Sequence, residues 1–144
     1  MDVTGCWRLR VWRRLTDGGE PTYPLGEGAT GVLIYAPDGT MGVQMVAAGR
    51  RPLPTDDALG GDPDARAVAY STCLAYFGTY EVQGDSVIHQ IEGSLFPNWS
   101  GTVQARPFTL DANELVLRTP PTTGPGGTVV NEICWFRESA EPAG

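Results

Sequence analysis

Short runs of alternating apolar and polar residues recur along the chain. This alternation is typical of β-strands that bury one face and expose the other. In the first run, residues 5–15, Trp7, Leu9 and Val11 share one face, and arginines occupy the other. Trp12 falls on the arginine-bearing face in this register. We therefore expect Trp12 on the outside of the fold, where it favours a homo-oligomer.

Further runs of this kind predict additional strands, and the segments between them are rich in turn-forming residues. The predicted strands cover residues 30–36, 40–46, 76–82, 86–92, 101–109, 114–119 and 129–137. Between the first two of these, Pro37, Asp38 and Gly39 predict a hairpin turn. One short helix is expected after Asp62, which suits an N-cap, with Pro63 at the first helical position.

These elements predict an all-β fold of about eight antiparallel strands with one short helix. A sheet of this size hides its edge strands most simply by closing into a barrel. The interior of an eight-stranded barrel has room for one small ligand. Because 144 residues are the size of one domain, we expect residues 1–144 to form a single barrel domain.

The charge of the chain narrows the classes of partner. The net charge is -7 at neutral pH, and a negative surface repels nucleic-acid phosphates and anionic membrane surfaces. We therefore expect neither a nucleic acid nor a membrane as a partner. The first residues lack the pattern of a signal peptide, and no apolar run approaches the roughly 20 residues that span a bilayer. These features predict a cytoplasmic protein.

Few side chains in the sequence are reactive. There is one histidine, His89, and the three cysteines, Cys6, Cys73 and Cys134, are too widely spaced to suggest a metal site. All ten basic residues are arginines, which excludes a Schiff-base lysine. No serine lies in the sequence context of a nucleophile elbow. We expect neither a metal nor another cofactor.

Several motifs resemble those of the lipocalin-like domain family, small single-barrel proteins of bacteria and fungi. Gly5 and Trp7 match the G-x-W signature of lipocalins, and Arg137 lies where lipocalins place an arginine that packs on that tryptophan. Other matching segments are residues 23–26, 31–35, 38–41, 78–80, 87–89 and 135–137. The resemblance implies a lipocalin-like barrel in which Trp7 and Arg137 are structural residues that close one end through cation–π stacking.

The resemblance also implies a class of function. Members of this family accompany polyketide and other natural-product pathways. Some are similar to cyclases, or pericyclases, that catalyse a transannular cycloaddition of the four-plus-two or six-plus-four type. The implied substrate is a polyene or macrolactone-like molecule, and the implied reaction needs no cofactor.

Three polar residues on predicted strands are the candidates for catalysis: Tyr80, His89 and Arg106. A hydrogen bond from such a group polarises a conjugated carbonyl. His89 shares a strand face with Val87 and Ile91, so we expect it inside, either as a hydrogen-bonded core residue or as a contact of the substrate. For Arg106 an inward and a solvated outward position remain open, because a buried unpaired charge costs several kcal/mol.

The expected pocket lining is apolar and aromatic, and ordinary core packing is the alternative for each of its residues. The candidate substrate-binding residues are Leu33, Tyr35, Met41, Val43, Met45, Tyr76, Trp99 and Trp135.

Three hypotheses about function follow. The first is a cyclase whose pocket holds an apolar substrate in its reactive conformation, which contributes on the order of 7–11 kcal/mol in favourable cases. The second is a non-catalytic carrier of an apolar small molecule. The third is a structural module whose interior is filled by its own side chains.

Overall fold

The structure is a computed structural model that describes residues 2–137. Its strands, in chain order, are β1 (Gly5–Thr16), β2 (Thr30–Tyr35), β3 (Thr40–Val46), β4 (Cys73–Gln83), β5 (Ser86–Ser94), β6 (Val103–Asp111), β7 (Glu114–Arg118), β8 (Thr122–Gly124) and β9 (Gly127–Phe136). The helix α1 (Pro63–Ser71) lies between β3 and β4, and a 3-10 turn, η1 (Pro97–Trp99), between β5 and β6. The ends of the predicted domain, residues 1 and 138–144, lie outside the described residues.

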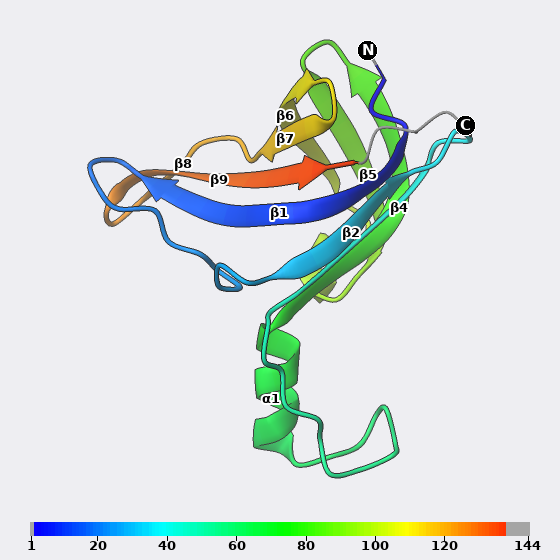
Figure 1. Ribbon diagram of the computed structural model, residues 1–144, viewed down its shortest axis with the longest axis vertical. Coiled ribbons are helices and arrows are strands. Elements are labelled where there is room, and N and C mark those ends of the chain that lie inside the picture. The colour runs from blue at the N-terminus through cyan, green and yellow to red at the C-terminus, as the bar shows by residue number, and fades with distance from the viewer. Residues whose placement is uncertain (1, 138–144) are drawn as a thin grey trace, which may run out of the picture.

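Eight of these strands form a closed antiparallel barrel (Figure 1). Each strand pairs with the next in the order β1-β2-β3-β4-β5-β6-β7-β9, and β9 pairs back on β1 to complete the ring. The short strand β8 pairs only with β9 and lies outside this ring, within a segment where the sequence predicts a loop. The predicted all-β fold, a lipocalin-like barrel of about eight strands, is confirmed.

The predicted short helix is also present. The side chain of Asp62 accepts hydrogen bonds from the backbone N–H groups of Asp64 and Ala65, which is the geometry of an N-cap. None of the helix residues is buried. The helix and the loop before it extend away from one end of the barrel (Figure 1), so α1 contributes little to the core. No helix of the described residues is long and apolar enough to cross a membrane.

A β-bulge in β1 changes which residues face the interior. The register of β1 against β9 shifts between Leu9 and Val11, so Arg10 is an extra residue in the ladder. Beyond this point the two faces exchange, so that Trp12 packs against the core inside the barrel and the exposed Arg14 lies at the open end. The prediction that Trp12 lies on the outside of the fold is therefore wrong, because simple alternation assumes an uninterrupted strand.

One end of the barrel is closed by Trp7 together with Val3, Thr4 and Arg137. The Trp7 side chain is fully buried, and its Nε1 donates to the carbonyl oxygen of Val3 (2.8 Å). The guanidinium carbon of Arg137 lies 4.3 Å from the centroid of the Trp7 ring. Nη1 of Arg137 donates to the carbonyl oxygen of Thr4 (2.8 Å). The predicted contact between Trp7 and Arg137 is thus present, and it ties the N-terminal segment to the end of β9.

Large side chains fill the interior next to this closed end. Tyr35, Met41 and Leu115 are each at most 1% exposed and belong to the same hydrophobic cluster as Trp7. Because protein interiors pack as densely as organic crystals, this half of the barrel has no room for a ligand. Any cavity must therefore lie toward the opposite end.

Replacing Arg137 by Gln is expected to lower the free energy of unfolding by about 2 kcal/mol. The variant loses a charge-assisted hydrogen bond, which contributes about 1.5–3 kcal/mol, and a cation–π contact. Urea denaturation measures the change. The control is Arg8→Gln on the exposed outer face of β1, and an equally large loss there would contradict a specific role for Arg137.

Candidate functional site

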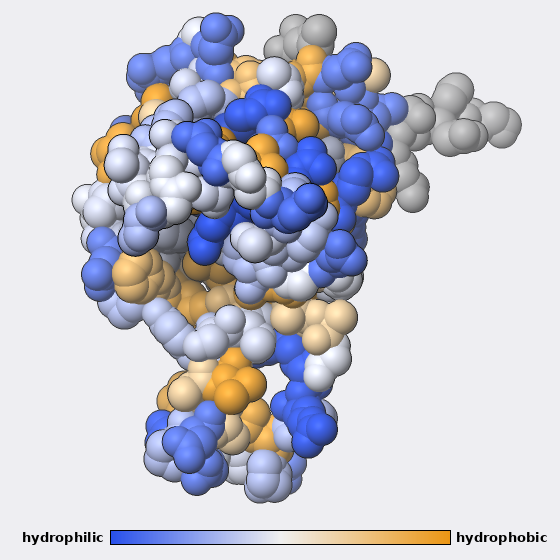
Figure 2. All heavy atoms as spheres, turned by 90° about the vertical axis from the view of Figure 1, so that its left-hand side faces the viewer, coloured by the Kyte–Doolittle hydropathy of each residue, from blue (hydrophilic) through white to orange (hydrophobic). Residues whose placement is uncertain are grey.

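A cavity of about 770 Å³ occupies the half of the barrel away from Trp7. Its mouth lies where the β1–β2 loop, the end of α1, η1 and the segment after β7 come together. Apolar side chains are visible in the hollow between the barrel and the extended segment (Figure 2). The apolar residues of its wall include Trp12, Leu33, Val43, Met45, Phe96, Leu117 and Ile133.

Most of the residues predicted to form the site do line this cavity. They are Leu33, Val43, Met45, Tyr76, His89, Trp99, Arg106 and Trp135. They come from six strands and from η1, so only barrel closure brings them together.

Three predicted residues do not reach the cavity: Tyr35, Met41 and Tyr80. Tyr35 and Met41 are packed in the filled half of the barrel. The hydroxyl of Tyr80 donates to the carbonyl oxygen of Ala36 (2.8 Å) and lies 3.2 Å from Oγ1 of Thr4, at the closed end. Alternation along a strand predicts which side chains face inward, but it does not give their depth along the barrel axis. The structure therefore places the Tyr80 hydroxyl where it does not contact a molecule in the cavity.

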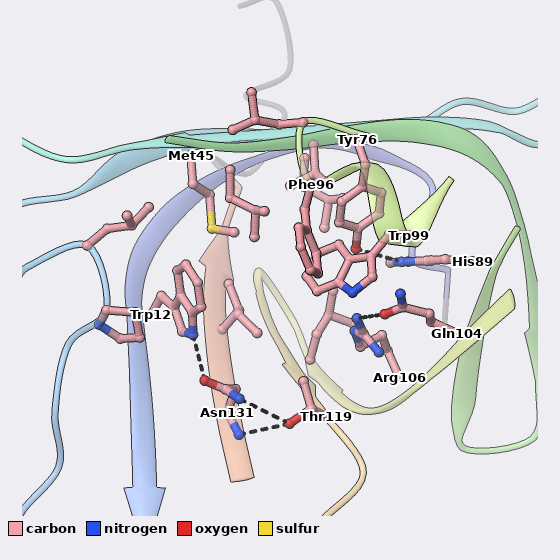
Figure 3. A pocket seen from close by; sticks show the side chains of 18 of the residues that line it. Trp12, Met45, Tyr76, His89, Phe96, Trp99, Gln104, Arg106, Thr119 and Asn131 are labelled. Carbon is pink, nitrogen blue, oxygen red and sulfur yellow. Dashed lines mark hydrogen bonds between the residues drawn. The ribbon is translucent and has the colours of Figure 1, made fainter. Parts of the chain in front are cut away.

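Other cavity residues are absent from the predicted set. The bulge in β1 turns Trp12 toward the cavity, where its Nε1 donates to Oδ1 of Asn131 (3.0 Å). The backbone N–H of Asn131 donates to Oγ1 of Thr119 (2.9 Å). Figure 3 shows these three residues on one side of the cavity. Asn131 shares one face of β9 with Ile133 and Trp135. Alternation along this strand is therefore a sequence signal that Asn131 faces the interior.

His89 lies at the centre of a buried hydrogen-bonded cluster. The hydroxyl oxygen of Tyr35 is 2.6 Å from Nε2 of His89, and that of Tyr76 is 3.0 Å from Nδ1. The His89 side chain has no exposed surface. Burial, together with the nearby positive charge of Arg106, lowers the pKa of His89 to about 3. The imidazole is therefore neutral at physiological pH.

The two tyrosines also remain protonated. Burial raises the pKa of Tyr35 well above its ordinary value of 10.0. It also raises the pKa of Tyr76, against the opposing effects of the Arg106 charge and of a side-chain hydrogen bond from Arg106. A neutral imidazole has one N–H donor and one acceptor nitrogen. One tyrosine therefore donates its proton to His89, and the other accepts the imidazole N–H.

Burial decides between these two arrangements. Tyr35 is fully buried away from the cavity, whereas Tyr76 lines it, so only the O–H of Tyr76 can reach an acceptor that enters the cavity. A buried hydroxyl left without an acceptor costs about 1–3 kcal/mol. Tyr35 therefore donates to Nε2, and Nδ1 donates to the oxygen of Tyr76. This leaves the O–H of Tyr76, a residue of the cavity wall, free to donate to a bound molecule.

Arg106 provides a positive charge on the same wall. It points inward and is 8% exposed, which answers the question that the sequence left open. Its Nη1 donates to the carbonyl oxygen of Ala105 (3.2 Å), and its Nη2 donates to Oε1 of Gln104. The ion pairs of the described residues involve other arginines. Arg106 is thus a largely buried cation without a carboxylate partner.

We expect the stability of the wild-type protein to fall more steeply with acidification than that of a His89→Gln variant. The folded-state pKa of His89, about 3, is below the 6.5 of an unfolded chain, so the unfolded state binds a proton first as pH falls below 6.5. This costs up to about 1.4 kcal/mol per pH unit. Urea denaturation at pH 7, 6 and 5 measures it, and carboxylate titration, common to both proteins, cancels in the difference. Parallel pH profiles would contradict a buried neutral imidazole.

Comparison with known proteins identifies a family and a relative. The family model described as a lipocalin-like domain matches residues 4–137. A protein of Aspergillus oryzae (strain ATCC 42149 / RIB 40), named 4'-hydroxy-3'-methoxypropiophenone carrier protein ppsC, is 32% identical over 87 residues, which are 55% of this chain and 78% of that relative. The family match spans the whole barrel, from the residue before β1 to the residue after β9. The chain therefore belongs to the lipocalin-like domain family.

Proposed function

We propose that this protein binds one apolar small molecule in the open half of its barrel. The observation that carries the proposal is the cavity of about 770 Å³ with a largely apolar wall. Ligand pockets in proteins are typically about 300–1,000 Å³ and combine apolar walls with a few polar groups. The cavity has this composition, with His89, Arg106 and Tyr76 as polar groups among aliphatic and aromatic side chains.

The size of the cavity supports binding over a purely structural role. About 770 Å³ remains between the side chains of the open half. A module with no ligand would gain stability by filling this space, because apolar cavities are destabilising. The volume therefore argues against the hypothesis of a filled barrel.

The similarity to a named carrier protein supports the same proposal. The relative's name describes a carrier of an aryl ketone, a largely apolar molecule with a conjugated carbonyl. Binding without chemistry needs only a cavity of suitable size. 4'-Hydroxy-3'-methoxypropiophenone is accordingly a suitable first probe for this protein.

Narrowing the cavity is expected to weaken binding. Val43→Phe places a larger side chain on the cavity wall of β3 and should lower the affinity for the aryl ketone at least about tenfold, since about 1.4 kcal/mol corresponds to a factor of ten. Isothermal titration calorimetry measures the affinity.

The matched control for this experiment is Gln44→Phe, which adds the same ring to the exposed outer face of β3. It should bind like the wild type. If neither this ketone nor a general apolar probe such as 1-anilinonaphthalene-8-sulfonate binds the wild-type protein, the proposed function is wrong.

A second candidate is catalysis of an intramolecular cycloaddition in the same cavity. The observation that favours it is the free O–H of Tyr76 on the wall that also carries Arg106. Donors aimed at a conjugated carbonyl withdraw electron density and lower the barrier to cycloaddition. An apolar wall that holds a flexible polyene in a folded conformation lowers the entropic part of the barrier. Such a reaction forms carbon–carbon bonds without a change in mass and needs no cofactor.

Removing the donor on Tyr76 tests this second candidate. With a linear or macrocyclic polyene lactone as substrate, Tyr76→Phe should lower the rate of formation of a product of unchanged mass by about a hundredfold. Liquid chromatography with mass spectrometry follows the product. The control is Tyr23→Phe, which removes a hydroxyl from a residue that does not line the cavity. If the wild-type protein changes neither rate nor product ratio, it is not a cyclase for this substrate class.

A further inference from the structure

The polar groups of the cavity wall are unbalanced in charge and in hydrogen bonding. The protein has 17 acidic residues and a net charge of -7, yet none of the residues that line the cavity is an aspartate or a glutamate. Two arginines, Arg14 and Arg106, do line it. The cavity is therefore a local positive region within an acidic protein.

The same wall has more hydrogen-bond donors than free acceptors. A guanidinium has five N–H groups, and the hydrogen bonds of Arg106 to Ala105 and Gln104 use two of them. The hydroxyl of Tyr76 has its proton free. The indole N–H of Trp135, a further lining residue, is buried and has no partner among the described residues.

The acceptors near these donors are already engaged. Oε1 of Gln104 accepts from Arg106, and both ring nitrogens of His89 are held by tyrosines. Across the cavity, Oδ1 of Asn131 accepts from Trp12 (Figure 3). Buried donors in proteins are normally paired, and a bound molecule with acceptor oxygens would pair with these donors.

We propose that the ligand of this cavity is an apolar molecule with an acidic oxygen, either a carboxylate or the enolate of a 1,3-dicarbonyl, which pairs with Arg106. This inference rests on the proposed function and adds the chemical class of the ligand. A planar guanidinium binds two oxygens of one such group side by side, and a charge-assisted pair is stronger than a neutral hydrogen bond. In an apolar cavity the pair is also screened less than in water.

The placement of the donors gives the orientation of the ligand. Arg106 and Gln104 lie on one wall, and Trp12 and Met45 lie across the cavity from them (Figure 3). With its acidic oxygen at Arg106, the ligand directs its apolar part toward Trp12 and Met45. The O–H of Tyr76 lies on the wall beside His89, where it can donate to a second oxygen, as in a 1,3-dicarbonyl.

A matched pair of fluorescent ligands tests this inference. 1-Pyrenebutyrate and 1-pyrenebutanol share the same apolar body and differ in the anionic group. The wild-type protein should bind the carboxylate at least about tenfold more tightly at pH 7, and Arg106→Gln should reduce this ratio to near one while it still binds the alcohol. Arg8→Gln removes one exposed positive charge from β1 and should keep the wild-type ratio.

The outcomes separate this inference from the proposed function. Equal affinities in the wild type, or an unchanged ratio in Arg106→Gln, overturn the assignment of an acidic ligand but leave apolar binding in place. If the wild type binds neither compound, both proposals fail. Arg106→Lys, which keeps the charge and loses the planar fork, should retain part of the preference. The wild-type ratio by itself decides the inference if Arg106→Gln does not fold.

Discussion

The pairing of β1 with β9 is the interaction on which the rest of the structure depends. It joins the two ends of the sheet, so that the barrel has an inside and an outside. The cation–π contact between Trp7 and Arg137 closes one end of the same seam. The bulge near Arg10 lies in this pairing as well, and it turns Trp12 toward the cavity, where it meets Asn131 of β9. One seam therefore determines closure, the filled end and part of the cavity wall.

The barrel is divided into a half that stabilises the fold and a half that is available to a ligand. In the closed half, the buried side chains of Tyr35, Met41 and Leu115 belong to one hydrophobic cluster with Trp7. In the open half, largely apolar walls surround the cavity. His89 lies at the boundary between these halves, because it bonds to Tyr35 on the closed side and to Tyr76 on the cavity wall. The hydrogen bonds of this cluster orient the Tyr76 hydroxyl so that its O–H can donate into the cavity, and none of the three side chains is ionised.

The burial of Arg106 lowers the stability of the folded protein. A cation that is 8% exposed and lacks a carboxylate partner is destabilising by several kcal/mol unless other groups compensate for the lost hydration. Its partners among the described residues are uncharged: the Gln104 amide, the Ala105 carbonyl and the Tyr76 hydroxyl. Groups that weaken the fold and face a cavity are characteristic of functional sites, since their benefit is realised when a ligand binds. The same reasoning applies to the unpartnered N–H of Trp135.

The sequence by itself determined the element types and most of the inward face. Period-two alternation predicted the barrel strands, and the N-cap at Asp62 predicted the start of α1. The contact of Trp7 with Arg137 was implied by the resemblance to lipocalins. Alternation and helix capping depend on residues close together in the chain, so they can be predicted from the sequence alone.

Only the tertiary structure decided the depth of each residue and the partners across the barrel. Tyr35 and Tyr80 face inward or lie near the interior as their strands predict, yet they belong to the closed end. Trp12 changed sides because one extra residue in β1 shifts the ladder, a feature that alternation cannot contain. The burial of Arg106 and its position on the same wall as Tyr76 depend on strand register. They also depend on how far the side chains packed around Trp7 fill the barrel. These are distances between residues far apart in the chain, and packing sets them.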